Sequence, residues 1–142
     1  MERTLAIIKP EAVQRGVAGA IIHRLEREGF VIRAMTMVHL SKAQAEVFYA
    51  VHRGKPFFDS LTTYMSSGPI VAILLERDNA IAHLRAVMGA TDPARAAPGT
   101  IRAEFGTNIE QNAIHGSDSP ESAEREIAFF FSVRDTLAAQ GV

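Results

Sequence analysis

Several features are missing from the 142-residue sequence, and each absence excludes a class of function. The chain has no cysteine, which excludes thiol catalysis, disulfide bonds and thiolate metal sites. Its formal net charge is −1, so it has no overall positive field to attract nucleic acid, and any anion must bind at a local site. Neither of the usual glycine-rich phosphate-binding motifs, G-x-x-x-x-G-K-S/T and G-x-G-x-x-G, is present.

Long apolar runs are absent too. The N-terminal run at residues 5–8 stops at Lys9-Pro10 and is too short for the core of a signal peptide, and no other run approaches the length needed to span a membrane. Hydrophobic residues make up 47% of the chain and charged residues 22%, which is typical of a protein folded in water. We therefore expect a cytoplasmic protein without membrane contact, in which residues 1–142 form a single domain.

Hydrophobic periodicity predicts alternating strands and helices. Strands are predicted for residues 5–8, 31–40 and 70–75. Helices are predicted for residues 10–16, between Ala18 and Gly29, after Ser41, for residues 57–65, after Asp78, and from Ser119-Pro120 onward. Residues 89–112 show no periodicity, and an irregular stretch of that length is more often functional than idle. The alternation excludes all-α and all-β folds, but it leaves open a parallel doubly wound sheet or an antiparallel sheet with helices on one face.

Cap residues predict how two of these helices begin. Ser41 is expected to cap its helix, with Ala43, Val47 and Phe48 facing the core. Asp78 is expected to cap the next long helix.

His115 is the leading candidate for a reactive residue. Imidazole is largely neutral at physiological pH, so it can act as a nucleophile without special tuning. Glu126 falls on the helix that follows and can orient the ring, while Gly116 is expected to leave space for an incoming group. Each residue also has an ordinary alternative, since His115 can be a loop or core histidine and Glu126 a half-solvated surface carboxylate.

Three cations could together bind a polyphosphate. Lys9 directly follows a predicted strand, Arg85 lies near the apolar side of a helix, and Arg102 lies in the irregular stretch. Each is an ordinary surface charge when considered alone. Acting together, each would contribute about 1.5–3 kcal/mol through a charge-assisted hydrogen bond.

Phe57 is the candidate for contact with an aromatic ligand. At the start of a predicted helix, its ring can either stack on a base or belong to the core, and stacking hardly distinguishes one base from another. The five histidines have no ligand spacing with each other or with carboxylates, so no protein-bound metal is expected.

The segment at residues 112–119, N-A-I-H-G-S-D-S, resembles the active-site signature of nucleoside diphosphate kinases. Further blocks match in the same order along essentially the whole chain: residues 2–4, 7–10, 55–58, 67–69, 88–91 and 98–102. The resemblance implies an α+β fold, the ferredoxin-like βαββαβ sandwich with a four-stranded antiparallel sheet covered by helices. It also implies that the γ-phosphoryl group of ATP or another nucleoside triphosphate passes to a nucleoside diphosphate by a ping-pong mechanism.

The resemblance assigns roles to individual residues. It makes His115 the phosphorylated nucleophile, reacting at Nδ1, and Glu126 the carboxylate that orients its ring. It implies phosphate contacts from Lys9, Arg85, Thr91 and Arg102, ribose contacts from Asn112 and Lys9, a base slot at Phe57, Leu61 and Ile109, and a tyrosine, Tyr49, close to the histidine. Mg²⁺ is expected to bridge the nucleotide phosphates and to touch few protein groups. Stacking on Phe57 implies broad base specificity.

Two departures from the family pattern bear on assembly and on the loop. Asp92 stands where the family usually has asparagine, and as another good turn residue it is expected to have little effect. Residues 133–142 match poorly, so the implied homo-oligomer can be a tetramer or a hexamer. A non-catalytic nucleotide-binding regulatory module on the same fold is the alternative, but such a module would be expected to have lost His115, Lys9 or an arginine. Binding of DNA is disfavoured by the net charge.

Overall fold

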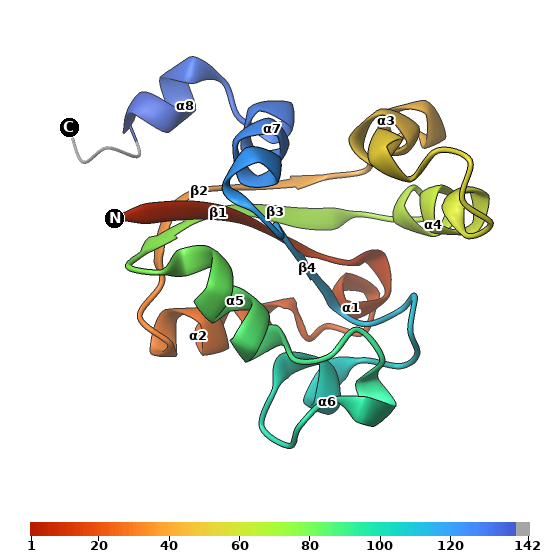
Figure 1. Ribbon diagram of the computed structural model, residues 1–142, viewed down its shortest axis with the longest axis horizontal. Coiled ribbons are helices and arrows are strands. Elements are labelled where there is room, and N and C mark those ends of the chain that lie inside the picture. The colour runs from red at the N-terminus through yellow and green to blue at the C-terminus, as the bar shows by residue number, and fades with distance from the viewer. Residues whose placement is uncertain (139–142) are drawn as a thin grey trace.

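The computed structural model describes residues 1–138 and contains a four-stranded antiparallel sheet (Figure 1). The strands are β1 (Glu2–Ile8), β2 (Val31–Val38), β3 (Ile70–Arg77) and β4 (Ile114–Gly116), in the order β2-β3-β1-β4. Every neighbouring pair is antiparallel. This topology confirms the antiparallel sandwich implied by the resemblance and excludes the parallel alternative.

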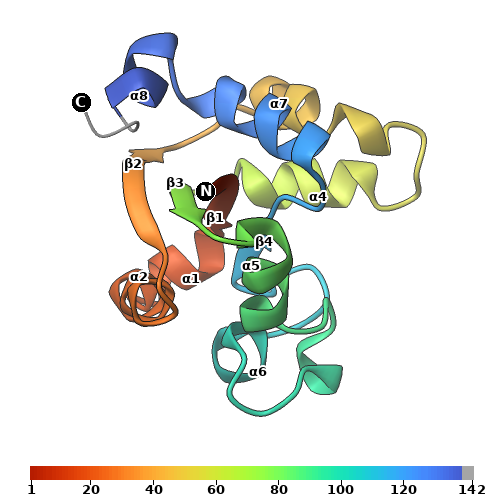
Figure 2. The same cartoon turned by 60° about the vertical axis from the view of Figure 1, so that its left-hand side comes forward.

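Helices cover both faces of the sheet (Figures 1 and 2). The α-helices are α1 (Pro10–Gln14), α2 (Ala18–Arg27), α3 (Lys42–Phe48), α4 (Phe58–Met65), α5 (Ala80–Met88), α6 (Ile101–Phe105), α7 (Pro120–Phe130) and α8 (Val133–Ala138), with short 3-10 turns η1 (Ala50–His52) and η2 (Pro93–Arg95). Helices α1, α2, α5 and α6 lie on one side of the sheet, and α3, α4 and α7 lie on the other. None of these helices is long and apolar enough to cross a membrane.

The two layers explain the apolar runs in the sequence. Successive side chains of a strand point to opposite faces, so Ala6 and Ile8 of β1 pack with α2 and α5, whereas Leu5 and Ile7 pack with α3 and α4. Because both faces are covered, residues 5–8 of β1 and 70–75 of β3 are continuously apolar instead of alternating. Continuous apolar runs therefore do not require a parallel sheet.

Strand β2 lies at one edge of the sheet, and its side chains are only partly covered. Val31, Met35 and Met37 are 39%, 51% and 61% exposed, respectively. Within the described chain, the outer edge of this strand has no partner strand. An apolar edge of this kind is a ready surface for pairing with another chain.

Tertiary packing overrides two of the local expectations. Ser41 caps α3 through a capping box with Gln44, as predicted, but Ala45 and Phe48 form the buried face, and the prediction that Ala43 and Val47 face the core is wrong. The cap predicted at Asp78 is also wrong. Helix α5 begins after Asn79, and the Glu2 carboxylate of β1 accepts a hydrogen bond from the Ile81 amide at 2.8 Å.

The irregular stretch contains η2 and the five-residue helix α6, which periodicity did not predict. Asp92 accepts a hydrogen bond from the Ala94 amide at 3.0 Å and so stabilises the start of η2, which is a suitable role for a turn residue. Of the poorly matching segment 133–142, the first part forms α8 and residues 139–142 lie outside the described residues.

Candidate active site

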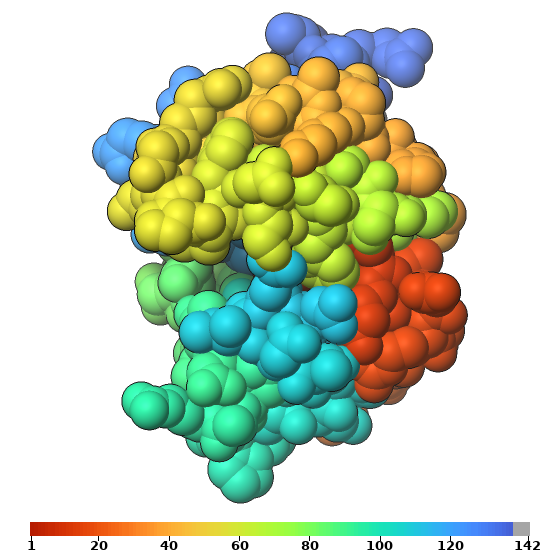
Figure 3. Space-filling view, turned by 90° about the vertical axis from the view of Figure 1, so that its right-hand side faces the viewer, coloured from red at the N-terminus to blue at the C-terminus, as the bar shows by residue number. Residues whose placement is uncertain are grey.

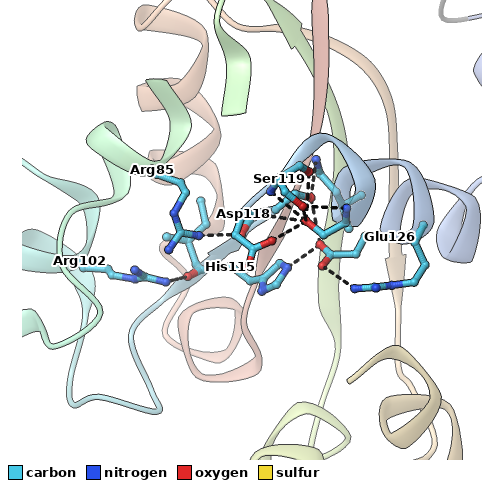
Figure 4. Close-up of polar contacts among 12 residues, drawn as sticks. Arg85, Arg102, His115, Asp118, Ser119 and Glu126 are labelled. Atoms are coloured by element: carbon cyan, nitrogen blue, oxygen red, sulfur yellow. Dashed lines mark hydrogen bonds and ion pairs between the residues drawn. The ribbon is translucent and has the colours of Figure 1, made fainter. Parts of the chain in front are cut away.

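His115 and Glu126 come from consecutive elements, β4 and α7. His115 is the central residue of β4 and pairs with Ile7 of β1. The chain then enters α7 at Ser119, whose side chain forms a capping box with Ser122. This turn brings residues eleven positions apart together, so that His115 Nε2 lies 2.7 Å from Glu126 Oε1 (Figure 4).

The contact with Glu126 determines which imidazole nitrogen is free. A carboxylate can only accept here, so Nε2 carries the proton and Nδ1 of the neutral ring keeps its lone pair. Ser117 Oγ donates to the same Oε1 at 3.0 Å, and Arg125 Nη2 lies 3.7 Å from Oε2. Glu126 is buried and held by three side chains, so it can fix the orientation of the ring.

Aromatic rings enclose the imidazole without isolating it. The Phe48 and Tyr49 rings meet it edge-on at centroid distances of 5.6 and 6.0 Å. The His115 side chain keeps 19% exposure, so a ligand can reach it. Burial raises the pKa of the Tyr49 phenol, and the charge of Glu126 raises it further, so this tyrosine stays neutral.

Gly116 serves helix packing and does not provide space for an incoming group, so that prediction is wrong. A Cβ atom at this position would lie 2.6 Å from Met88 Sδ and 2.9 Å from Leu84 Cδ2, both on α5. Glycine thus allows α5 to approach β4 closely. The same approach brings Arg85 Nη1 to 3.2 Å from the Gly116 carbonyl oxygen.

Substituting Gly116 with alanine is therefore expected to destabilise the fold by about 1–3 kcal/mol, because the core around α5 has no room for the methyl group. Gly19→Ala is the matched control. Its added Cβ meets no atom within 4 Å, and alanine in helix α2 is expected to stabilise by about 0.5–1 kcal/mol. Urea unfolding of both variants measures the difference, and equal stabilities would show that β4 and α5 are not tightly packed.

Two guanidinium groups lie near His115, both on the same side of it in Figure 4, and bind the carbonyls of its two neighbours in β4. Arg102 Nη2 donates to the Ile114 carbonyl at 2.8 Å, and Arg85 donates to the Gly116 carbonyl, so the residues on both sides of His115 hold an arginine. Arg102 is only 6% exposed, and within the described part of the chain its Nε has no partner. Burial first and the charge of Arg85 second lower the pKa of Arg102 to about 10, so it stays charged at neutral pH.

Lys9 and Asn112 lie at the junction of β1 and the loop before β4. The Lys9 amide donates to the Ala113 carbonyl at 2.9 Å, and its Nζ donates to the Glu110 carbonyl at 3.3 Å. Asn112 Nδ2 donates to the carbonyls of Thr91 and Ile109, both at 3.0 Å. Its Oδ1 is buried and has no partner within residues 1–138, so it is available for a ligand group.

Phe57 and Phe58 separate as expected. Phe57 precedes α4 and is 45% exposed, whereas Phe58 packs against the core. Ile109, predicted for the same slot, is 63% exposed. Sequence reasoning missed His52, whose ring lies 5.2 Å from Phe57 and stacks on Tyr49 at 6.2 Å. The one sequence signal that could have indicated His52 is its position three residues after Tyr49.

The residues gather around one cleft. Figure 3 shows a hollow between the yellow segment that precedes α4 and the green segment that follows α5, with the blue β4–α7 region at its base. Two other hollows, one between β1, α7 and α8 and one between α1 and α4, are lined by none of Lys9, Arg85, Arg102 and His115. The cleft of Figure 3 is therefore the candidate active site.

Comparison with known proteins identifies the family. A model of the nucleoside diphosphate kinase family matches residues 2–136. A nucleoside diphosphate kinase of Sorangium cellulosum is 58% identical over 132 residues, which cover 93% of this chain and 92% of that relative. One of Nitratidesulfovibrio vulgaris is 55% identical over 137 residues, covering 96% of this chain and 99% of the relative.

Solved structures agree. The nucleoside diphosphate kinase of Aquifex aeolicus superimposes with a TM-score of 0.92 at 49% identity, covering 94% of this chain and 97% of the other. A halophilic nucleoside diphosphate kinase from Halobacterium salinarum, solved in complex with CDP, gives 0.90 at 43% identity, covering 94% and 90%. The chain therefore belongs to the nucleoside diphosphate kinase family and is a phosphotransferase, which confirms the resemblance at residues 112–119.

Proposed function

We propose that His115 accepts the γ-phosphoryl group of a nucleoside triphosphate on Nδ1 and passes it to a nucleoside diphosphate. Transfer of phosphoryl groups between nucleotides by a ping-pong mechanism is the activity of the family to which the chain belongs. The observation that supports the role of His115 is the 2.7 Å contact of its Nε2 with the buried Glu126, which leaves Nδ1 as the free nucleophile.

Each half-reaction exchanges one bond. The Nδ1 lone pair attacks the γ-phosphorus, the bond from that phosphorus to the β-phosphate oxygen breaks, and the diphosphate leaves with the electron pair. Glu126 stabilises the positive charge that develops on the ring, because Nε2 keeps its proton and donates a hydrogen bond to the carboxylate. A second diphosphate then reverses the steps. No general base is needed, because the neutral ring has no proton on the attacking nitrogen.

Catalysis in this scheme is positioning combined with fixed positive charge. Phosphoryl transfer has a loose transition state with charge spread over the transferred oxygens. Lys9, Arg85 and Arg102 supply the cations, and Arg85 and Arg102 are already held by β4 carbonyls on either side of the nucleophile. Thr91 completes the proposed phosphate contacts.

The nucleoside half of the ligand is assigned to the outer part of the cleft. Asn112 and Lys9 are proposed to contact the ribose, and the buried, unpaired Oδ1 of Asn112 supports this assignment. The half-exposed Phe57 ring is proposed to stack on the base, together with Leu61 and Ile109. Stacking distinguishes bases poorly, so broad base specificity follows.

Mg²⁺ is proposed to bind with the nucleotide. The ion prefers phosphate and water ligands with few carboxylates. Residues 1–138 contain no group of three histidine or acidic side chains that could hold an ion by themselves, so the phosphates of the nucleotide are the expected ligands. When bound, the ion would help to neutralise the charge of the phosphates.

A homo-oligomer, either a tetramer or a hexamer, is also proposed, with residues 1–142 acting as one catalytic domain in the cytoplasm. The exposed apolar side chains of β2, Val31, Met35 and Met37, support self-association, because an uncovered edge strand is a liability for a monomer. A non-catalytic module is not favoured, since the nucleophile and every proposed phosphate contact are present.

Labelling tests this function directly. Incubation with γ-labelled ATP and Mg²⁺ is expected to give a phosphoprotein that is acid-labile and base-stable, because a phosphorus–nitrogen bond forms. Adding an unlabelled nucleoside diphosphate should then transfer the label to a triphosphate. An intact, folded protein that binds ATP but takes up no label would favour the non-catalytic alternative instead.

A further inference from the structure

The amine of Lys9 is the least compensated charge in the cleft. Lys9 is 6% exposed, and among residues 1–138 the one hydrogen bond of its Nζ is the 3.3 Å contact with the Glu110 carbonyl oxygen. The ion pairs of the site join Glu126 to His115 and to Arg125, and over residues 1–138 no carboxylate lies within 4.0 Å of the Lys9 amine. A buried ammonium in this position has almost nothing to replace its lost hydration.

One cation, Arg102, and one anion, Glu110, act on Lys9, and the effect of the cation is the larger. The buried Arg102 guanidinium is held only by neutral carbonyls, and Arg85 adds a further positive charge on Arg102. Glu110 is the one anion that acts on Lys9, but it lies beyond ion-pair distance and its Oε1 accepts a hydrogen bond from Ser60 at 3.1 Å. Burial first and Arg102 second lower the pKa of Lys9 to about 7, against the opposing effect of Glu110.

On the basis of the proposed function, we propose that nucleotide binding is coupled to proton uptake by Lys9. In the free protein at pH 8 the amine is largely neutral, because its charged form is buried near the Arg102 guanidinium and no carboxylate of residues 1–138 lies within ion-pair distance of it. A bound polyphosphate supplies that anion, so the ammonium becomes the favoured form in the complex. The site therefore acquires its full positive charge only when a phosphate ligand arrives.

The sign of the pH dependence follows from this coupling. Between the pKa of Lys9 in the free protein, about 7, and its higher value in the complex, the complex holds more protons. Affinity is then highest below about pH 7 and falls by up to about tenfold per pH unit above it. The terminal phosphate of the nucleotide loses its second proton at about pH 6. It therefore stays ionised above pH 7, where the affinity is expected to fall, and does not obscure the titration of Lys9.

Isothermal titration calorimetry with ADP and Mg²⁺ in two buffers of different protonation enthalpy measures the coupling. We expect uptake of close to one proton per ADP at pH 8.5 and much less at pH 6. Lys9→Arg keeps a permanent charge and should show no uptake and a flat affinity between pH 7 and 9. Lys9→Met, which has no titrating group, should also show no uptake, and circular dichroism verifies that each variant is folded.

Two further variants identify the proton acceptor. His115→Ala should retain the proton uptake. If instead Lys9→Arg retains the uptake and His115→Ala loses it, the proton belongs to the imidazole and the proposal is overturned. Glu110→Gln removes the opposing anion and should increase uptake at pH 7. Binding of ADP without a buffer-dependent enthalpy at pH 8.5 contradicts proton coupling alone, whereas absence of ADP binding contradicts the proposed function itself.

Discussion

Replacing His115 with alanine is expected to lower phosphoryl transfer between nucleotides by roughly 10⁴- to 10⁶-fold, because the nucleophile of a covalent mechanism cannot be replaced by water at comparable rate. The methyl side chain cannot form a phosphorus–nitrogen bond, so the labelled phosphoprotein should disappear together with turnover. A coupled assay with ATP and dTDP measures the rate, and acid and base treatment of the protein measures the label.

The interpretation depends on the variant remaining folded and able to bind. The ring packs against Phe48 and Tyr49, so its loss leaves a small space near the surface but no buried charge other than Glu126. ADP affinity within a few-fold of the parent chain would show that the cleft is intact. His23→Ala, an exposed histidine on α2, is the matched control and should retain label and rate. Retention of label in the His115 variant would place the phosphoryl group elsewhere.

Replacing Glu126 with alanine is expected to lower kcat by roughly 10²- to 10³-fold while the apparent KM changes much less. Without the acceptor at 2.7 Å, the proton of the neutral ring can occupy either nitrogen and the ring can turn, so Nδ1 presents its lone pair only part of the time. The positive charge on the ring in the transition state also loses its carboxylate partner. Steady-state rates at saturating and limiting nucleotide separate the two parameters.

Ser117→Ala separates orientation from general packing. Ser117 donates to the same carboxylate oxygen at 3.0 Å but, within residues 1–138, forms no hydrogen bond with the ring, so its loss is expected to cost about 0.5–1.5 kcal/mol of stability and little of kcat. Glu126→Gln keeps an acceptor oxygen and should fall between the parent and Glu126→Ala. Equal losses of kcat in Ser117→Ala and Glu126→Ala would show that Glu126 has only a structural role.

The long apolar strands and the final helix could be predicted from sequence because each has a strong local signal. Strands β1 and β3 contain continuous apolar runs at residues 5–8 and 70–75, and α7 begins with a serine cap and a proline. The juxtaposition of His115 and Glu126 was accessible for the same reason, since only one turn and one helix separate them. The matching motif then assigned roles that periodicity alone could not.

The remaining features depend on contacts between distant residues. Strand β4 is three residues long, and its pairing with β1 makes it a strand, which no local preference predicts. The start of α5 is capped by Glu2, seventy-nine positions away. Likewise, the role of Gly116 depends on the approach of α5, and the arginines converge on β4 only through the fold.

The strand order places the two edges of the sheet in different roles. The proposed reactive ring belongs to β4 at one margin, while the uncovered methionines belong to β2 at the opposite margin, with the largely buried strands β1 and β3 in between. In the proposed homo-oligomer, substitutions on the β2 margin are consequently expected to alter how copies of the chain associate without reaching the chemistry. Such an arrangement would let the quaternary structure diversify during evolution while the transfer reaction is preserved.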